Sequence, residues 1–355
     1  MRLSGKNYKR IVIKVGSSLF YSKKESLDIE RLSEVILQVA HLLKKEGKEI
    51  VIVSSGAIAL GMDVLGLKSR PKDLPFLQAA AAIGQNVLMD SYGFFLKKNG
   101  INSAQILLTW DDFNDRKRYL NAKNTLQTLL KLGSVPIINE NDTVSTEEIR
   151  FGDNDRLSAM VAALISADLL IILSDVDGLL DEKKNVISVV DEINAQIKSL
   201  ACPTTKRTCV GGMITKIEAA KICVDSGIPC VIANGQKKDI IALVLRQPQN
   251  HGTLFVSGAG LTERERWIAF GTKPKGKICI DDGAKKALLN KKSLLSVGVS
   301  GIENSFERGD IVSIVDAQGS EFARGKTTVS SKKLDEVKGK KFEKEIIHRN
   351  DIVVL

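Results

Sequence analysis

The stretch Val135–Ser174, VPIINENDTVSTEEIRFGDNDRLSAMVAALISADLLIILS, decides the fold class of this chain. It begins with an apolar run at Val135–Asn139 and ends with a second one at Leu169–Ser174, and the apolar helical segment LSAMVAALI lies between them. Short β-branched runs separated by longer amphipathic segments are typical of βαβ units, in which the strands lie parallel in one sheet. Because the runs are apolar throughout rather than alternating, we expect strands that are buried on both faces.

The same alternation extends outward from this stretch, from the start of the chain to about residue 256. Further strands are expected at Ile11–Val15, Glu49–Ser54, Ala104–Thr109 and Pro229–Ala233. Between the first two, apolar residues recur at helical spacing from Ile29 to Leu43 and end at Gly47, a suitable C-cap. The sequence therefore predicts an α/β fold, a three-layer αβα sandwich around a mainly parallel sheet.

The pattern changes after His251, where turn residues and charges follow one another without a sustained period. Short strand candidates follow at Ile278–Ile280, Ser296–Val299, Ile311–Val315, Phe322–Ala323 and Ile352–Val354. Gly and Asp turns separate them, as expected for a small, mostly β domain. We therefore predict a first domain at residues 1–257, a connector at 258–274 and a second domain at 275–355.

The composition limits the chemistry that the chain can perform. Its 355 residues are 43% hydrophobic and 26% charged, as expected for a soluble protein, and no apolar stretch is long enough to span a bilayer. Five cysteines without a C-x-x-C pair and only three histidines argue against a cysteine- or histidine-based metal site and against a histidine-based triad. We expect a cytoplasmic protein with free thiols, without a membrane contact, whose catalysis uses other groups.

The net charge of +10 is unevenly distributed along the chain. Residues 271–355 hold 17 Lys and Arg against 12 Asp and Glu, so this segment carries half of the positive excess. A basic surface of this kind could bind a polyanion. It could equally be a solvated surface that binds no ligand.

Two turns at predicted strand ends offer backbone N–H groups to an anion. Neither a P-loop nor a G-x-G-x-x-G motif is present. Lys14 instead interrupts the first apolar run just before Gly16, and the turn Ser55–Gly56–Ala57 follows the second strand. Ligands of parallel sheets bind beyond the carboxyl ends of the strands, so both turns could hold a phosphate or a carboxylate. The alternatives are a lysine that snorkels at a strand end and an ordinary helix cap.

Two polar clusters lie within fifteen residues of each other. Asn139–Asp142 follows one predicted strand, and Gly152–Asp155 precedes the apolar helix. Asn and Asp are common in turns and caps, so one cluster alone needs no functional explanation. Turns and caps alone do not explain two such clusters beside the ends of predicted elements. Their side chains could bind an ammonium group, orient lysines or hold Mg²⁺.

A later segment completes the pattern of a phosphoryl-transfer site. Ser174 and Asp175 end a buried strand, and the Gly211–Gly212 pair precedes a helix that carries Lys216 one turn in. Lysines at Lys14 and Lys216 on two sides of one crevice would suit a transferring phosphoryl group, since its transition state needs mainly positioning and cations. A carboxylate acceptor needs no general base, because it is already ionised at neutral pH.

These motifs resemble the amino acid kinase family, and within it the glutamate 5-kinases. The resemblance covers nearly the whole chain, and INEND with GDND is its most specific part. It implies the reaction of ATP with L-glutamate to give ADP and L-glutamyl 5-phosphate, the first step of proline synthesis. Mg²⁺ would then be carried mainly by the ATP phosphates.

The resemblance also implies roles for individual residues. Lys14 and Lys216 would stabilise the moving phosphoryl group, and Asp155 would orient them. The implied glutamate-binding residues are Ser55, Gly56, Ala57, Asp142 and Asn154. The implied ATP-binding residues are Lys14, Gly16, Ser174, Asp175, Val210, Gly211, Gly212, Met213, Ile214, Thr215 and Lys216. The family usually reads Gly-Thr-Gly-Gly before Met, whereas Cys209 and Val210 stand here before Gly211, so the backbone cradle is expected without a side-chain contact from Val210.

The C-terminal region resembles a PUA domain, which occurs in RNA-modifying enzymes and in many bacterial glutamate 5-kinases. Fold analogy and basic charge suggest RNA binding, but a structural or regulatory role is favoured because aromatic residues for base stacking are scarce in this region. The resemblance further implies a homo-oligomer and transfer of the acyl phosphate to glutamyl phosphate reductase. The alternatives are a kinase of acetylglutamate, aspartate, carbamate or a nucleoside monophosphate, and an RNA-binding protein that uses the PUA-like domain.

Overall fold

The computed structural model describes residues 7–19, 28–145, 154–201, 212–258 and 260–355. The chain divides into two compact units, each with its own core. The first unit comprises Met1–Asp112 and Arg116–Gly260, and the second comprises Phe113–Asp115 and Leu261–Leu355. None of the helices in the described ranges combines the length and the apolar character that a membrane span requires.

An eight-stranded sheet forms the middle of the first unit, in the order β3-β4-β2-β1-β5-β7-β8-β6. Its strands are β1 (Arg10–Val15), β2 (Glu49–Ser54), β3 (Ser103–Leu108), β4 (Val135–Glu140), β5 (Leu169–Ser174), β6 (Val189–Val190), β7 (Cys230–Asn234) and β8 (Thr253–Phe255). All pairings are parallel except that of β7 with β8. The predicted, mainly parallel sheet is therefore confirmed, and each of its six predicted strands is present.

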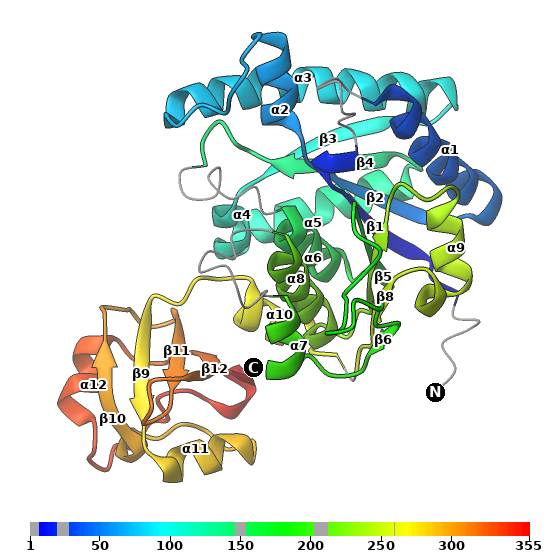
Figure 1. Ribbon diagram of the computed structural model, residues 1–355. Coiled ribbons are helices and arrows are strands. Elements are labelled where there is room, and N and C mark those ends of the chain that lie inside the picture. The colour runs from blue at the N-terminus through cyan, green and yellow to red at the C-terminus, as the bar shows by residue number, and fades with distance from the viewer. Residues whose placement is uncertain (1–6, 20–27, 146–153, 202–211, 259) are drawn as a thin grey trace. The chain divides into compact units, whose positions relative to one another are not determined.

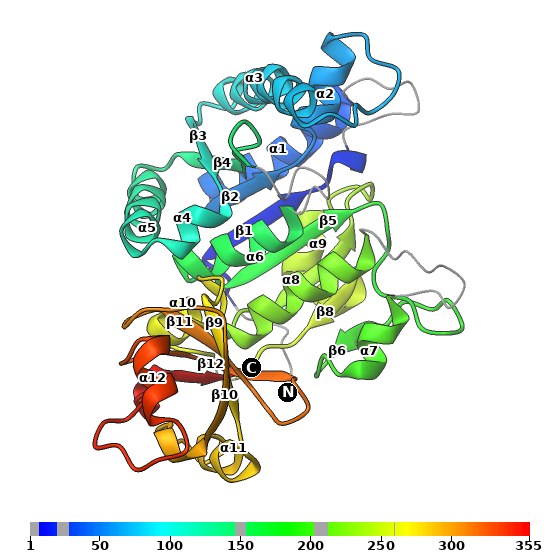
Figure 2. The ribbon, with the colours of Figure 1, turned by 90° about the vertical axis from the view of Figure 1, so that its left-hand side faces the viewer.

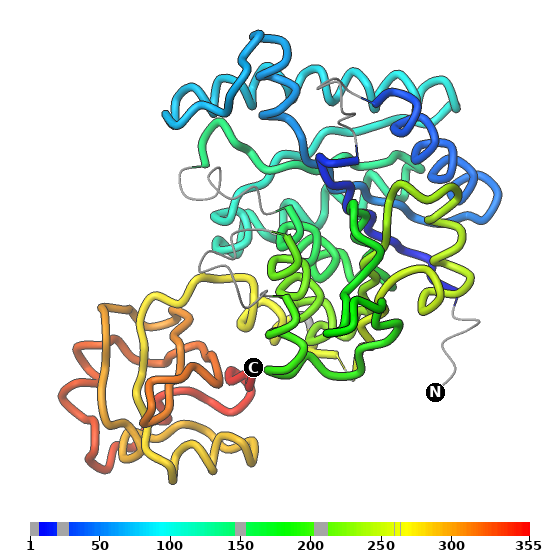
Figure 3. Tube along the Cα trace, in the orientation of Figure 1, coloured from blue at the N-terminus to red at the C-terminus, as the bar shows by residue number. Residues whose placement is uncertain are grey.

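Helices cover both faces of this sheet, which confirms the three-layer αβα architecture (Figures 1 and 2). The helices are α1 (Ile29–Glu46), α2 (Ala57–Val64), α3 (Leu74–Lys98), α4 (Trp110–Asn114), α5 (Arg116–Lys131), α6 (Asn154–Ile165), α7 (Ala195–Leu200), α8 (Met213–Asp225) and α9 (Ile240–Arg246). Short 3-10 helices occur at Ser17–Leu19 and Pro248–Asn250. One face packs against α1, α3 and α9, and the other against α5, α6 and α8. The chain trace in Figure 3 shows α6 and α8 side by side, although their first residues, Asn154 and Met213, are 59 positions apart in the sequence.

Burial of the strands follows their position in the sheet. The central strands β1, β4 and β5 are buried almost throughout, as their continuous apolar runs predict. Strand β3 differs, because it lies at the edge of the sheet and most of its residues are only half-buried. The expectation of burial on both faces is thus wrong for β3, since an edge strand lacks a neighbour on one side.

Two glycines let α2 and α3 approach each other closely. A Cβ atom on Gly61 would lie 1.7 Å from the carbonyl oxygen of Ala80, and one on Gly84 would lie 1.8 Å from that of Ala57. Real side chains cannot occupy such positions, so only glycine permits this contact. Because Ala57 begins α2 directly after β2, the contact fixes the turn at the end of β2.

The second unit is built around a five-stranded sheet in the order β10-β9-β11-β12-β13. Its elements are α10 (Glu263–Phe270), β9 (Gly276–Ile280), α11 (Asp282–Leu289), β10 (Val299–Glu303), β11 (Ile311–Val315), β12 (Glu321–Lys326), α12 (Ser331–Val337) and β13 (Ile352–Val354), with 3-10 helices at Ser296–Gly298 and Arg349–Asp351. Ile278, Ile280, Val312 and Ile314 from adjacent strands contribute to its core. The prediction of a small, mostly β C-terminal fold is confirmed.

One local expectation in this region differs from the structure. The segment predicted as a strand at Ser296–Val299 is mostly a 3-10 helix, and β10 begins only at Val299. Helix α10 lies within residues 258–274, the segment that the sequence predicts to be a connector. Its start is stabilised by a capping box, in which Thr262 accepts from the backbone N–H of Glu265 and the Glu265 side chain accepts from the backbone N–H of Thr262.

Candidate active site

A cavity of about 280 Å³ lies at the carboxyl edge of the sheet in the first unit. Because β1, β2, β4 and β5 run parallel, the residues at their carboxyl ends meet at this edge. The cavity is lined by Lys14, Gly16, Ser17, Ser18, Ser55, Gly56, Ala57, Ile58, Ala59, Arg70, Asn139, Glu140, Asp142, Asn154, Ser174, Asp175 and Lys216.

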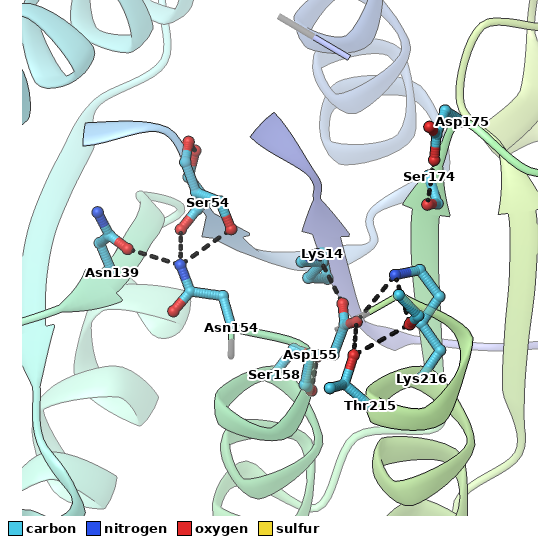
Figure 4. Close-up of polar contacts among 12 residues, drawn as sticks. Lys14, Ser54, Asn139, Asn154, Asp155, Ser158, Ser174, Asp175, Thr215 and Lys216 are labelled. Atoms are coloured by element: carbon cyan, nitrogen blue, oxygen red, sulfur yellow. Dashed lines mark hydrogen bonds and ion pairs between the residues drawn. The ribbon is translucent and has the colours of Figure 1, made fainter. Parts of the chain in front are cut away.

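Two lysines share one carboxylate at this cavity (Figure 4). Nζ of Lys14 lies 2.6 Å from Oδ1 of Asp155, and Nζ of Lys216 lies 3.0 Å from Oδ2 of the same residue. The three side chains come from β1, α6 and α8, and each is at most 10% exposed. The lysine that interrupts the first apolar run is therefore part of a buried ionic cluster and does not snorkel into solvent.

Opposing effects determine the ionisation of Asp155. Burial alone would raise the pKa of its carboxyl, but the charges of Lys14 and Lys216 outweigh burial and hold the pKa below its ordinary value of 3.8. Two ammonium groups and one carboxylate leave a single positive charge in the cluster. A buried group of this kind is suited to an anion that completes its charge balance.

The first turn of α8 holds Lys216 in place. Its Nζ also donates to the backbone carbonyl of Gly212 at 3.1 Å, and the Thr215 hydroxyl contacts Oδ2 of Asp155 at 2.9 Å. Gly212 has φ of 90°, a conformation that glycine adopts without strain. This turn therefore positions a lysine beside the free backbone N–H groups that begin a helix.

Asn154 is the neighbour of Asp155 in α6, but its side chain serves a different part of the site (Figure 4). Its Nδ2 lies 2.7 Å from the carbonyl oxygen of Ser54, 3.0 Å from the hydroxyl of Ser55 and 2.8 Å from Oδ1 of Asn139. Asn139 in turn donates to Oε1 of Gln85 at 2.8 Å. This network joins the ends of β2 and β4 to α3 and α6.

The network orients the turn that begins α2. The Ser55 hydroxyl accepts from Asn154, so its own hydrogen can be donated into the cavity. Gly56 has φ of 106°, a conformation that is unfavourable for other residues, and it lets the chain turn directly into the helix. Ser55, Gly56 and Ala57 thus present a hydroxyl and the N-terminus of α2 to the same cavity.

An acidic wall closes another side of the cavity. Glu140 is buried and its Oε1 accepts from the hydroxyl of Ser145 at 2.7 Å, whereas Asp142 is half-buried. Burial and the charge of Glu140 raise the pKa of Asp142 to about 7, although the positive charge of Arg70 lowers it. A positively charged ligand would stabilise the ionised form of Asp142.

Most of the residues predicted from sequence line this single cavity. Lys14, Gly16, Ser55, Gly56, Ala57, Asp142, Asn154, Ser174, Asp175 and Lys216 line it, and Asp155 lies between its two lysines. Gly212, Met213, Ile214 and Thr215 form the start of α8 and are not among the lining residues. Val210 and Gly211, together with Asp153, lie outside the described residues.

Sequence reasoning missed Arg70 and the role of Gln85. Arg70 lies in an exposed segment between α2 and α3, where a single charged residue gives no periodic or motif signal. Gln85 ends the stretch AAAAIGQ at residues 79–85, in which nothing indicates that the Gln85 side chain would contact Asn139 from another element.

The described residues contain no group of three or more His, Cys, Asp or Glu side chains that could hold a metal ion. The acidic side chains that line the cavity, Glu140, Asp142 and Asp175, do not form such a group. These residues therefore do not fit a dedicated, all-protein magnesium site.

Comparison with known proteins agrees with this architecture. A profile of the amino acid kinase family matches residues 9–234, and a profile of the PUA domain matches residues 276–353. A solved structure of N-acetylglutamate synthase from Neisseria gonorrhoeae has a similar fold, with a TM-score of 0.52 at 16% identity over 71% of this chain and 60% of that one.

Three relatives match the chain over almost its full length. Glutamate 5-kinase from Caldanaerobacter subterraneus subsp. tengcongensis is 43% identical, with 98% of each chain covered. Those from Dehalococcoides mccartyi and Dictyoglomus turgidum are 44% and 46% identical, covering 98% of this chain and 99% and 98% of theirs. The chain therefore belongs to the amino acid kinase family, and within that family to the glutamate 5-kinases.

Proposed function

We propose that this enzyme transfers the terminal phosphoryl group of ATP to the side-chain carboxylate of L-glutamate. The products are ADP and L-glutamyl 5-phosphate, and the reaction is the first step of proline synthesis. The observation that carries the proposal is the buried cluster of Lys14, Asp155 and Lys216 beside an amide-rich and acidic wall.

The lysine cluster suits the chemical step. A carboxylate oxygen of glutamate attacks the terminal phosphorus of ATP, and the bond from that phosphorus to the bridging oxygen breaks as ADP leaves. In such a transfer negative charge is spread over the equatorial oxygens, and fixed cations at the site stabilise it. Asp155 keeps Lys14 and Lys216 in place before the reaction, so little reorganisation is needed when the charge develops.

The opposite wall suits the amino acid. In our proposal the reacting carboxylate accepts from the Ser55 hydroxyl near Asn154, and the α-ammonium group lies against Asp142. The side-chain carboxylate of glutamate is ionised at neutral pH, so no general base has to remove a proton. Glutamate bound in this way would direct its reacting oxygen toward the lysines.

ATP would lie along the ends of β5 and α8. Ser174 and Asp175 end β5 and line the cavity, and the α8 N-terminus offers backbone N–H groups to phosphate. In this proposal Mg²⁺ enters with the phosphates of ATP rather than at a site of its own. We further propose that the enzyme is a homo-oligomer, that it acts in the cytoplasm, and that its product is transferred to glutamyl phosphate reductase.

A direct assay tests the reaction. Purified enzyme with ATP and Mg²⁺ is incubated with glutamate, acetylglutamate or aspartate, and hydroxylamine traps an acyl phosphate as a hydroxamate. We expect hydroxamate and ADP in equal amounts with glutamate, and only background amounts with the other two acids. Preferential formation of hydroxamate from acetylglutamate or aspartate would show that the substrate is a different acid.

RNA binding by the second unit is a second candidate function. The observation that favours it is a cavity of about 800 Å³ in that unit, lined in part by Lys291, Lys292 and Arg349 beside the half-exposed Leu295. Cationic and apolar groups together suit phosphates and bases. Fluorescence anisotropy with a labelled transfer RNA should then show binding that weakens steeply with salt. Binding that is undetectable at low salt would contradict this candidate.

A further inference from the structure

The charges around the active-site cavity are arranged in two groups. Lys14 and Lys216 lie with Asp155 on one side, and Glu140 and Asp142 form the acidic wall. Among the described residues that line the cavity, Arg70 is the one cationic side chain outside the lysine cluster. It belongs to the segment between the end of α2 and the start of α3.

Free glutamate carries three charged groups, and the proposed binding mode uses two of them. Its side-chain carboxylate faces Lys14 and Lys216, and its α-ammonium group faces Asp142. The α-carboxylate must then lie near the same acidic wall, because only one carbon atom separates it from the ammonium group. An unpaired carboxylate beside Glu140 and Asp142 would be repelled, so this position requires a cation.

We propose that Arg70 binds the α-carboxylate of the amino acid substrate and thereby makes the enzyme select acids with a free α-carboxylate. This inference rests on the proposed function of the same cavity. It adds a residue that determines substrate specificity, since Arg70 takes no part in the phosphoryl transfer itself.

The surroundings of Arg70 support this assignment. Arg70 and Asp142 line the same cavity, and the guanidinium charge lowers the pKa of the Asp142 carboxyl against the effects of burial and Glu140. The two side chains therefore border one space, which the α-carboxylate and the α-ammonium of a bound amino acid would share. A guanidinium group also fits a carboxylate better than an ammonium does, because its planar fork can donate two parallel hydrogen bonds.

The α-amide of glutamate provides the decisive comparison. It keeps the reacting side-chain carboxylate and the α-ammonium group, but its neutral amide cannot form an ion pair with Arg70. We expect wild-type kcat/KM to be about 30- to 100-fold higher for glutamate than for the α-amide, as for a lost charge-assisted hydrogen bond.

The experiment compares both substrates in wild type, Arg70→Gln, Arg70→Lys and Lys72→Gln. Lys72→Gln is the matched control, because it removes one positive charge from the same exposed segment at a residue that is not among those lining the cavity. ADP release is measured at about pH 8.5, where Asp142 is ionised and its titration does not confuse the result. Circular dichroism and thermal unfolding check that each variant is folded.

In Arg70→Gln we expect kcat/KM for glutamate to fall about 30- to 100-fold, while kcat/KM for the α-amide and the KM for ATP change less than about threefold. Arg70→Lys should keep part of the discrimination, and Lys72→Gln should keep all of it. The assignment would be overturned if Arg70→Gln left the ratio of kcat/KM for glutamate to kcat/KM for the α-amide unchanged, whether both values fell equally or neither fell. Wild-type enzyme that leaves glutamate unphosphorylated would instead refute the proposed function.

Discussion

Lys14 and Lys216 place two positive charges in a buried environment. Each lysine is removed from water, and Asp155 compensates for only one of the two charges. Such a cluster adds little to stability, because the loss of hydration offsets the attraction between the charges. In the proposed mechanism, the cluster serves to hold two cations in position before the phosphoryl group arrives.

We therefore expect Lys216→Ala to lower kcat by about 10³-fold, since the charge acts mainly in the transition state. Lys221→Ala is the matched control, because Lys221 lies on the same helix and pairs with Asp225 near the surface. Kinetics of glutamate-dependent ADP release should show less than about a twofold change in Lys221→Ala. Near-normal kcat in Lys216→Ala would refute the two-lysine mechanism.

Asp142 should make glutamate binding depend on pH. Its pKa of about 7 means that the carboxyl is largely protonated below neutrality, and only the ionised form can pair with an ammonium group. We expect the KM for glutamate to fall about tenfold between pH 6 and pH 8, while the KM for ATP stays nearly constant. Asp142→Asn should abolish this pH dependence. If the KM for glutamate of that variant still fell between pH 6 and pH 8, the dependence would come from Glu140 or another group.

The same pKa has the opposite effect on the free protein. Because the folded-state pKa of Asp142 is raised from 3.8 to about 7, this group's contribution to stability is fully present below about pH 3.8 and is lost as pH rises through about 7. Glutamate binding should offset that loss. Thermal unfolding should accordingly show a larger stabilisation by glutamate at pH 8 than at pH 6.

At the scale of elements, the packing of α2 on α3 determines the position of the Ser55–Ala57 turn. In Gly84→Ala a methyl group would collide with the carbonyl of Ala57, so α2 must move away from its place at the end of β2. We expect a loss of about 2–4 kcal/mol in the free energy of unfolding, together with a higher KM for glutamate.

Gly93→Ala is the control for this prediction, since it changes the same helix where the nearest atom to a new Cβ is the Ser103 hydroxyl at 3.7 Å. Ala in a helix interior is favoured over Gly, so this variant should be as stable as wild type or up to about 1 kcal/mol more stable. Chemical denaturation of both variants measures the difference. Equal stability would mean that α2 and α3 can separate without cost.

The elements that could be predicted from sequence are those whose burial leaves a simple pattern. The central strands have continuous apolar runs because both faces are covered, and α1 shows helical periodicity because one face packs on the sheet. Helix α10 was not predicted, although its capping box was present in the sequence, because its apolar residues are too few to show a period.

The site was predictable to the extent that its residues lie at strand ends and in motifs. Lys14 and Asp142 follow this rule, whereas Arg70 does not. Arg70 reaches the cavity only because α2 and α3 place the segment between them there, and no local pattern records that placement. The hydrogen bond from Asn139 to Gln85 joins residues 54 positions apart and is equally invisible in the sequence.

At the scale of the whole molecule, each unit has its own hydrophobic core. Every residue that lines the active-site cavity belongs to the first unit, so the chemistry should not require the second. Helix α10 belongs to the second unit, where the buried Ile268 and Ala269 pack with Ile311 and Val353. A truncated chain that contains only the first unit should therefore end before α10 and not after it.

This boundary can be tested with two truncated chains, residues 1–260 and residues 1–274. The shorter chain should fold and keep kcat within about twofold of the full-length enzyme, because it ends before the apolar residues of α10. The longer chain retains Ile268 and Ala269 without Ile311 and Val353, and we expect this exposed surface to cause aggregation. Asn114, which groups with the second unit, accepts a hydrogen bond from the backbone N–H of Lys273 at 2.7 Å, so the shorter chain loses this contact and the longer chain keeps it. Size-exclusion chromatography measures aggregation, and the hydroxamate assay measures activity. If the 1–274 chain were monodisperse and active while the 1–260 chain aggregated, the boundary would lie after α10.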